Sequence, residues 1–166
     1  MIQKGNKYMG TVSFIGRKNL DNTITGIYCH WDGDISWNGI VLNKCYKNID
    51  KINALINLGS LSSLDAEIGE ETDFNNPIKN QCIAYHRDRG EDLVIQQYKN
   101  EKEIISQYYE YVYIYDMHDS KWYCYDETGR KLLSDIIKEW TKTNKHNIKE
   151  RSKSLNEYIK SKKGAV

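Results

Sequence analysis

The sequence predicts an α+β fold, in which an antiparallel sheet built from hairpins carries a few packed helices and a basic C-terminal tail or helix. Strand-like runs rich in β-branched and aromatic residues occur near both ends of the folded part. Runs with helical spacing lie between and after them, without the regular strand–helix alternation of a parallel sheet. The length of 166 residues favours a single domain over 1–140, followed by the basic segment 141–166.

Two hairpins account for most of the expected sheet. The runs 11–17 and 24–31 are separated by the polar stretch KNLDNT, and the runs 111–116 and 121–126 by the turn MHDS. In the second hairpin aromatic side chains alternate with others, which is typical of a half-buried strand pair. A further short strand is expected over 81–86, immediately before a charged run.

Apolar residues at helical spacing predict three helices. The first lies within NIDKINALINLG, with Asn48 or Asp50 as its N-cap and the final glycine as its stop. The second is a short helix over 102–110. The third, over 132–140, has the apolar stripe of an amphipathic helix that packs on a core.

Positive charge is concentrated at the C-terminal end of the chain. The net charge is +1, but residues 141–166 hold eight Lys or Arg against two acids, whereas the first 140 residues hold 16 basic and 21 acidic residues. The body therefore lacks a surface suited to coating DNA, and only the tail is left as a weak candidate for contact with nucleic acid. Three apolar residues of the tail could anchor it as a helix: Leu155, Tyr158 and Ile159.

The chain shows no sign of a membrane or an oxidising compartment. It has no apolar run near 18 residues, and its N-terminus lacks the apolar core of a signal peptide. We therefore expect a cytoplasmic protein without membrane contact. The cysteines are scattered singly, and we expect them to be small buried hydrophobic residues. They are Cys29, Cys45, Cys82 and Cys124.

Two short charged runs are the candidate functional segments. YCHWDGD spans 28–34 and YHRDRGED spans 85–92, and each follows a predicted strand. Alternation along an extended strand would put Tyr85, Arg87 and Arg89 on one side. Two guanidinium groups on one side form a planar fork for phosphate or carboxylate. A tryptophan beside a polar turn can stack on a base or a sugar.

Both runs also have a plainer interpretation. The charges of the second run can pair with one another on a solvated turn, where ion pairs contribute little to stability. The tryptophans can belong to the hydrophobic core. The sequence nevertheless favours one ligand site made from both runs. Its expected residues are His30, Trp31, Asp32, Trp37, Tyr85, His86, Arg87, Asp88, Arg89 and Glu91.

Recognisable catalytic and metal-binding signatures are missing. Histidines and aspartates of the two runs have the donor types of a divalent metal site, but HWDGD matches no metal loop of known spacing. The common hydrolase, kinase and dinucleotide-binding motifs do not occur. We therefore expect no metal and no cofactor, and the sequence assigns no catalytic residue.

Several of these segments resemble a family of small proteins from bacteriophages and prophages. The resemblance rests on IYCHWDG, LINLGSLSSL, AYHRDRGEDL and the aromatic hairpin, and it covers roughly residues 9–126. It leaves the basic tail outside the family pattern and makes residues 1–8 an extension. Two departures concern the site. An aromatic residue and a proline that usually follow HWDG are Asp34 and Ile35 here, and two arginines near the family's opening are Val12 and Phe14.

The resemblance implies a viral accessory protein that acts in the cytoplasm of the host bacterium. Small phage proteins of this kind are often counter-defence factors, and several unrelated families hold nucleotide second messengers of bacterial immunity away from their effectors. If the missing arginines bind an anion in relatives, this chain has changed that part of the site. The analogy concerns biological role and supplies no biochemical activity by itself.

Three functions are compatible with the sequence. The first is a binding module that sequesters a small phosphorylated nucleotide, such as a cyclic oligonucleotide or an ADP-ribose derivative, and such a pocket can form between subunits of a homo-oligomer. The second is a phosphodiesterase or nuclease that degrades such a nucleotide, with His30 and His86 as acid and base. The third is a direct protein inhibitor of a host defence enzyme that docks through the hairpin 111–125.

Overall fold

The computed structural model describes residues 10–143 and 145–164 and confirms the α+β class. The strands are β1 (Ser13–Lys18), β2 (Ile24–Cys29), β3 (Leu61–Ser63), β4 (Ile83–Ala84), β5 (Gln96–Tyr98), β6 (Tyr111–Asp116), β7 (Lys121–Asp126) and β8 (Gly129–Leu132). The helices are the π-helical turn η1 (Ile35–Gly39), α1 (Ile40–Cys45), α2 (Ile49–Asn57), α3 (Tyr85–Arg89), α4 (Glu101–Ile105), α5 (Leu133–Thr143) and α6 (Lys145–Lys163).

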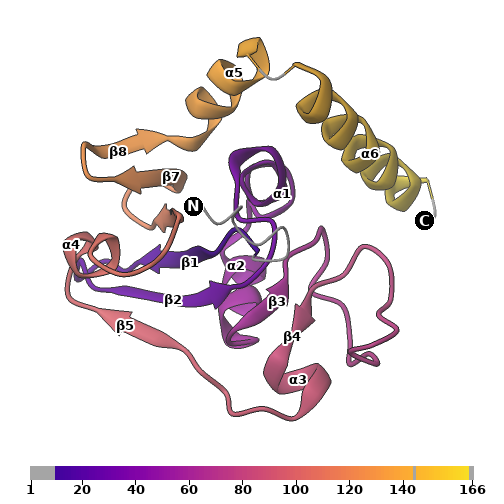
Figure 1. The fold of residues 1–166 in the computed structure, drawn as a ribbon, viewed down its shortest axis with the longest axis horizontal. Coiled ribbons are helices and arrows are strands. Elements are labelled where there is room, and N and C mark those ends of the chain that lie inside the picture. The colour runs from indigo at the N-terminus through magenta and orange to yellow at the C-terminus, as the bar shows by residue number, and fades with distance from the viewer. Residues whose placement is uncertain (1–9, 144, 165–166) are drawn as a thin grey trace, which may run out of the picture.

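All the strands join one mixed sheet in the order β4-β3-β2-β1-β6-β7-β8, and β5 also pairs with β2 (Figure 1). Both predicted hairpins are present, as β1–β2 and β6–β7. They are joined through a parallel pairing of β1 with β6, and β2 pairs in parallel with β3. The sheet is therefore not purely antiparallel, because the long segments between the hairpins provide the crossovers that parallel neighbours require.

Both faces of the central strands are covered. In β1, Ile15 belongs to the larger core formed with η1, α1, α2 and α5, whereas Phe14 belongs to a smaller core that includes Ile104 of α4. All three side chains are fully buried. A strand that is buried on both faces has no solvated face, which is consistent with the absence of charged residues from TVSFIG.

A pair of glycines makes room for the ring of Phe14 on the smaller core. Gly16 and Gly26 lie opposite each other on β1 and β2. A Cβ atom added to Gly26 would come within 2.4 Å of the Phe14 ring, 2.6 Å of the Ile15 carbonyl oxygen and 2.7 Å of the Gly16 Cα. Two of these atoms belong to the backbone, so the clash cannot be relieved by a rotamer change alone.

The substitution Gly26→Ala is therefore expected to lower the free energy of unfolding by about 1–3 kcal/mol, as overpacking does in close-packed cores. Urea unfolding followed by tryptophan fluorescence measures this change. The matched control is Gly164→Ala at the end of α6, where the nearest atom to an added Cβ is 3.7 Å away. Equal stability of the two variants would contradict the tight packing of Phe14 against this glycine pair.

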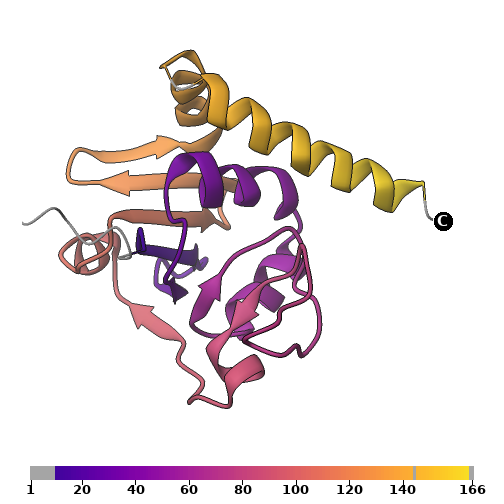
Figure 2. The ribbon, with the colours of Figure 1, turned by 45° about the vertical axis from the view of Figure 1, so that its right-hand side comes forward.

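The basic C-terminal segment forms a helix that packs on the body. Leu155 is 2% exposed and belongs to the larger core, and Tyr158 packs partly buried against the same core. Helix α6 contacts α5, η1 and α1 as it runs along one side of the molecule (Figure 2). None of the helices in the described residues is long and apolar enough to cross a membrane.

The structure also tests the expected N-cap of α2 and the expected burial of the cysteines. The N-cap of α2 is Asn48, whose side chain accepts a hydrogen bond from the Asp50 N–H. Cys29 and Cys82 are buried, whereas Cys45 and Cys124 are half-buried, and all four are free thiols. Burial raises the pKa of the Cys29 thiol to about 12, so it remains an unreactive hydrophobic group at neutral pH. The predicted extension over 1–8 lies outside the described residues.

Candidate functional site

The fold brings the two charged runs to the same end of the sheet. Strand β3 lies between them and contacts both. The backbone N–H of His30 donates to the Leu61 carbonyl at 3.0 Å, and the N–H of Tyr85 donates to the Ser60 carbonyl at 3.1 Å. The runs are therefore separated by one strand, although they are more than fifty residues apart in the sequence.

The sequence predicted that the second run continues the preceding strand, but in the structure it does not. Strand β4 ends at Ala84, and α3 begins at Tyr85. The carboxylate of Asp88 accepts hydrogen bonds from the N–H groups of Ala84 at 2.7 Å and Thr72 at 3.1 Å, and this stabilises the helical turn. The predicted strand alternation is wrong at this point. In a helix, Tyr85 and Arg89 share a face and Arg87 points elsewhere.

Arg87 points into the protein. Its guanidinium donates to the carbonyl oxygens of Ile68 and Cys82, both at 2.8 Å, and to the carboxylate of Asp88 at 2.8 Å. The Arg87 side chain is 16% exposed, and that of Asp88 is fully buried. Desolvation opposes ionisation of Asp88, but hydrogen bonds from Arg87 and the two backbone N–H groups lower its pKa overall. This pair ties the segment 65–84 to α3, and its role in ligand binding stays a prediction.

Arg89 points outward. Its guanidinium lies 4.3 Å from the ring centroid of Phe74 and 4.8 Å from that of Tyr85, and it pairs with Glu91 at 2.6 Å. About half of both charged side chains is exposed. The aromatic rings hold the flat guanidinium in place while part of it faces solvent. Only one arginine of the expected fork is therefore presented to solvent.

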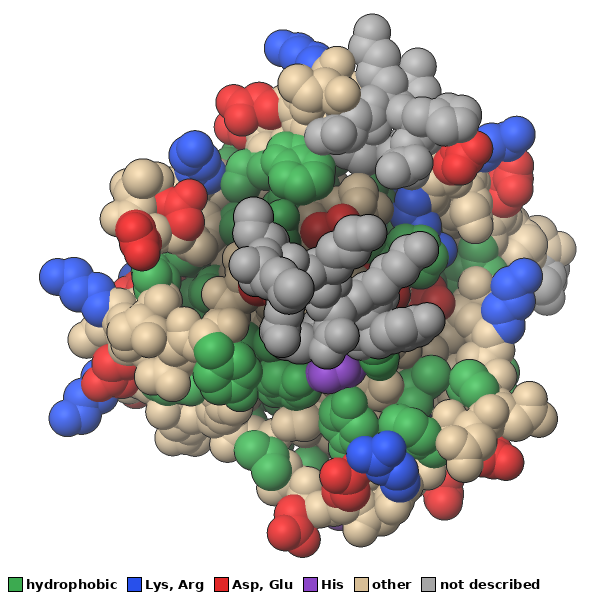
Figure 3. Space-filling model, in the orientation of Figure 1, with side chains coloured by type: hydrophobic (Ala, Val, Ile, Leu, Met, Phe, Trp, Pro, Cys, Tyr) green, Lys and Arg blue, Asp and Glu red, His purple; other side chains and the backbone are tan. Residues whose placement is uncertain are grey.

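A cavity of about 560 Å³ lies where the two runs meet. Two tyrosines contribute to it, one from each run, and the Tyr28 hydroxyl makes a 2.5 Å hydrogen bond with Nδ1 of His30. Desolvation raises the pKa of Tyr28, and the nearby Tyr85 adds to this rise. The lining residues are Tyr28, Ser60, Tyr85, Gly90, Glu91, Asp92 and Val94. In the view of Figure 3, several separate groups of hydrophobic side chains lie in the lower half of the molecule, among polar and charged ones.

Several of the expected site residues lie away from this cavity. The Trp37 ring is covered by the Arg151 guanidinium of α6 at 3.8 Å. Asp32 has a left-handed backbone with φ of 57°, and desolvation together with the negative charge of Asp34 raises its pKa. Trp31 is 37% exposed and stacks edge-on against His30 with ring centroids 4.5 Å apart. Trp31 and Asp32 belong to the first run and Trp37 follows it, but none of the three lines the cavity.

The two histidines have separate hydrogen-bond partners. His86 is exposed, and its Nδ1 lies 2.6 Å from the Glu91 carbonyl oxygen, whereas His30 is bound to Tyr28. Within the described part of the chain, no hydrogen bond joins His30 to His86, and no group of three His, Cys, Asp or Glu residues could hold a metal ion. Their use as an acid–base pair therefore stays a prediction.

The aromatic hairpin belongs mainly to the core. Tyr113, Tyr115, Trp122 and Tyr125 are each at most 8% exposed. Tyr113 donates to the Gly33 carbonyl at 2.7 Å, and the Trp122 indole donates to the Tyr46 carbonyl at 2.8 Å. These side chains support the fold and the turn of the first run, which leaves few of them available as a docking face.

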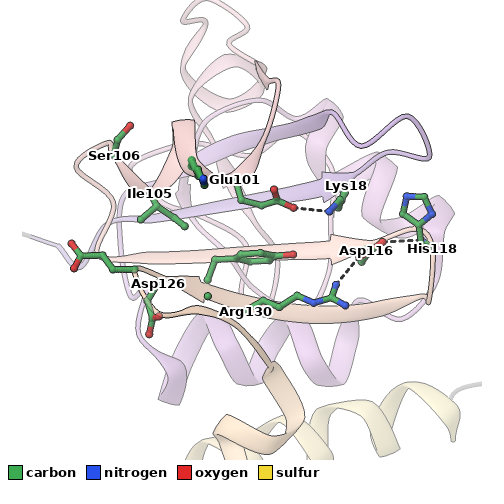
Figure 4. A pocket seen from close by; sticks show the side chains of 12 residues that line it. Lys18, Glu101, Ile105, Ser106, Asp116, His118, Asp126 and Arg130 are labelled. Carbon is green, nitrogen blue, oxygen red and sulfur yellow. Dashed lines mark hydrogen bonds and ion pairs between the residues drawn. The ribbon is translucent and has the colours of Figure 1, made fainter.

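The sequence did not predict a second and larger cavity, which has a volume of about 750 Å³ (Figure 4). It lies over β1, β6, β7 and β8, on the face covered by α4. Two ion pairs border it, Lys18–Glu101 at 2.7 Å and Arg130–Asp116 at 2.9 Å. Strand alternation could have indicated it, because Lys18 pairs with Asp116 and Tyr125 with Arg130 in the sheet register. The required pairing of β1 with β6 is parallel and could not be read from the sequence.

Comparison with known proteins assigns neither a family nor a function to the chain. No protein-family model matches the chain, and neither the curated proteins nor the solved structures contain a match.

Proposed function

We propose that the protein is a binding module that sequesters a small phosphorylated nucleotide in the cavity between the two charged runs. The observation that carries this proposal is the meeting of both runs at one cavity lined by Tyr28 and Tyr85, together with Arg89, which does not line the cavity but contacts its lining residues Tyr85 and Glu91. The resemblance to phage proteins suggests the role: an immune signal of the host bacterium is held away from its effector, in the host cytoplasm.

The nucleoside part of the ligand fits the cavity by size and chemistry. A volume of about 560 Å³ lies within the range of small-ligand sites, roughly 300–1,000 Å³. Tyr28 and Tyr85 offer aromatic faces for a base, because stacking is tolerant of base identity. Glu91 and Asp92 offer carboxylates that accept hydrogen bonds from ribose hydroxyls, as acidic residues do in dinucleotide-binding proteins.

The phosphate is assigned to Arg89. Its Nε and Nη2 groups both contact one oxygen of Glu91, at 2.6 Å each, and about half of the side chain is exposed. A guanidinium has five N–H donors, so others remain for a phosphate oxygen. The rings of Phe74 and Tyr85 already hold this group in one orientation, which reduces the entropy lost when a ligand binds.

Replacing Arg89 with alanine is expected to weaken nucleotide binding about 10- to 100-fold, because a hydrogen-bonded charge is worth about 1.5–3 kcal/mol. Isothermal titration with a panel of cyclic dinucleotides, cyclic trinucleotides and cyclic ADP-ribose isomers measures the change for whichever nucleotide binds the unmodified protein. The nucleotide affinity of the Arg89→Ala variant should also depend less on salt concentration, since one contact with phosphate is lost.

The control for this prediction is Lys142→Ala. It removes an equal charge from the exposed surface of α5, at the opposite end of the molecule from α3 (Figures 1 and 2). The proposal expects unchanged affinity in this variant. A loss of affinity equal to that of Arg89→Ala would show that net charge, and not the site at α3, governs binding.

A further inference from the structure

The larger cavity borders a buried hydroxyl group whose proton has no acceptor. Tyr125 of β7 is 8% exposed, and no described residue accepts a hydrogen bond from its hydroxyl group. Burial raises the pKa of this hydroxyl and the charge of Glu101 adds to the rise, whereas a hydrogen bond from Arg130 and the charge of Lys18 act against it. The group is therefore a protonated donor at neutral pH. Arg130 can approach only its oxygen, so the hydroxyl proton still lacks an acceptor.

Two cations border the same cavity as this hydroxyl (Figure 4). Lys18 Nζ gives one hydrogen bond to Glu101 at 2.7 Å, and Arg130 Nη1 gives one to Asp116 at 2.9 Å. An ammonium group has three donors and a guanidinium has five, so both retain unused donors. The carboxylates hold both cations in place beside the cavity.

The rest of the lining combines the apolar side chain of Ile105 with charged groups, among them Lys102, Asp126 and Glu127. Ile105 of α4 contributes an apolar side chain (Figure 4), and the Tyr125 ring also lines the cavity. The volume of about 750 Å³ is that of a small-molecule site with a few convergent polar groups. Residues at the turn between β7 and β8, including Asp126, Glu127 and Gly129, also line the cavity.

We propose that this cavity is a second ligand site, which binds a small planar molecule carrying one oxyanion group. The oxyanion accepts the Tyr125 hydroxyl proton and hydrogen bonds from Lys18 and Arg130, and its planar body packs between Ile105 and the Tyr125 ring. Three donors around one oxygen favour a charged acceptor, because charge-assisted hydrogen bonds are about twice as strong as neutral ones. The site goes beyond the proposed function, since the two cavities share no lining residue.

The test uses benzoate, phenyl phosphate and the neutral analogue benzamide as probes, titrated into the full-length protein and followed by NMR. We expect saturable binding of at least one anion, and the stronger of the two identifies the group as carboxylate or phosphate. Tyr125→Phe should weaken that binding about tenfold or more, the equivalent of one hydrogen bond to a charged acceptor. The melting temperature of this variant should stay unchanged or rise, because no described residue accepts a hydrogen bond from the lost hydroxyl.

The matched control is Tyr108→Phe, which removes a hydroxyl from a side chain that is 68% exposed and outside this cavity. It should leave anion binding unchanged. Arg130→Gln supplies a second test, since glutamine can still donate to Asp116 but lacks the charge, and anion binding should again fall. Three results would overturn the proposal: benzamide binding as tightly as the anions, full anion affinity in Tyr125→Phe, or a lower melting temperature in that variant.

Discussion

Replacing Arg87 with alanine is expected to lower the free energy of unfolding by about 3–5 kcal/mol, the usual cost of removing one partner of a buried ion pair. Asp88 would keep its fully buried carboxylate without its counter-ion. The carbonyl oxygens of Ile68 and Cys82 would lose their 2.8 Å donors at the same time. Urea unfolding measures the loss as a lower midpoint at an unchanged slope.

Arg89→Ala is the matched comparison on the same helix. Its guanidinium is about half exposed and pairs with an equally exposed Glu91, so the variant should lose no more than about 1 kcal/mol. The two substitutions are thus expected to have different effects: Arg87→Ala lowers stability, and Arg89→Ala weakens nucleotide binding. Equal stability losses in the two variants would contradict this division.

The stability difference between the unmodified protein and Arg87→Ala should depend on pH. The folded-state pKa of Asp88 is lowered, so its ionised form stabilises the native protein above the unfolded pKa of about 3.9. That stabilisation is lost as the pH falls through the lowered folded value. The difference between the two proteins should therefore be largest near neutral pH and shrink in acid, where an unpaired Asp88 is neutral.

Leu155→Ala is expected to lower the free energy of unfolding by about 2–5 kcal/mol, the range for removing a buried leucine side chain. Leu155 is 2% exposed and is the fully packed apolar contact of α6 with the larger core. Weaker docking of α6 should also speed hydrogen exchange of its backbone amides more than that of the sheet, because local opening requires only this helix to leave.

Leu20→Ala is the control for this substitution. Leu20 is 65% exposed in the loop between β1 and β2, so the same truncation should change stability by no more than about 0.5 kcal/mol. If Leu155→Ala behaved like Leu20→Ala, α6 would contribute little to the stability of the body. The packing of the basic segment would then need to be revised.

Local patterns in the sequence predicted the hairpins, the helix after Asn48 and the amphipathic helix α5. These elements depend on neighbouring residues, whose turn chemistry and apolar spacing are visible in a linear sequence. The pairing of β1 with β6 was not predictable, because the register between segments a hundred residues apart depends on the whole core. The short strand β3 was missed for the same reason, although it joins the two charged runs.

The sequence predicted which two segments meet at the candidate site more successfully than it predicted which of their residues line it. Helix α3 forms in place of the expected strand because Asp88 accepts hydrogen bonds from the N–H of Ala84, at the start of the turn, and from the N–H of Thr72. The contact with Thr72 has no local signature in the sequence. The change of element turned Arg87 inward and left Arg89 outside. Tyr28 was overlooked as a site residue because its contact with the cavity depends on where the chain places the second run.

The most direct test of the central claim, a ligand site between the two charged runs, is the fate of a bound nucleotide. The purified protein is incubated with the nucleotide panel, with magnesium and again with EDTA, freed of excess ligand by filtration, and then heat-denatured. We expect chromatography and mass spectrometry to recover an intact nucleotide from the unmodified protein and much less of it from Arg89→Ala. A shortened or linear product would contradict sequestration and indicate an enzyme, and retention of no nucleotide at all would contradict the ligand site itself.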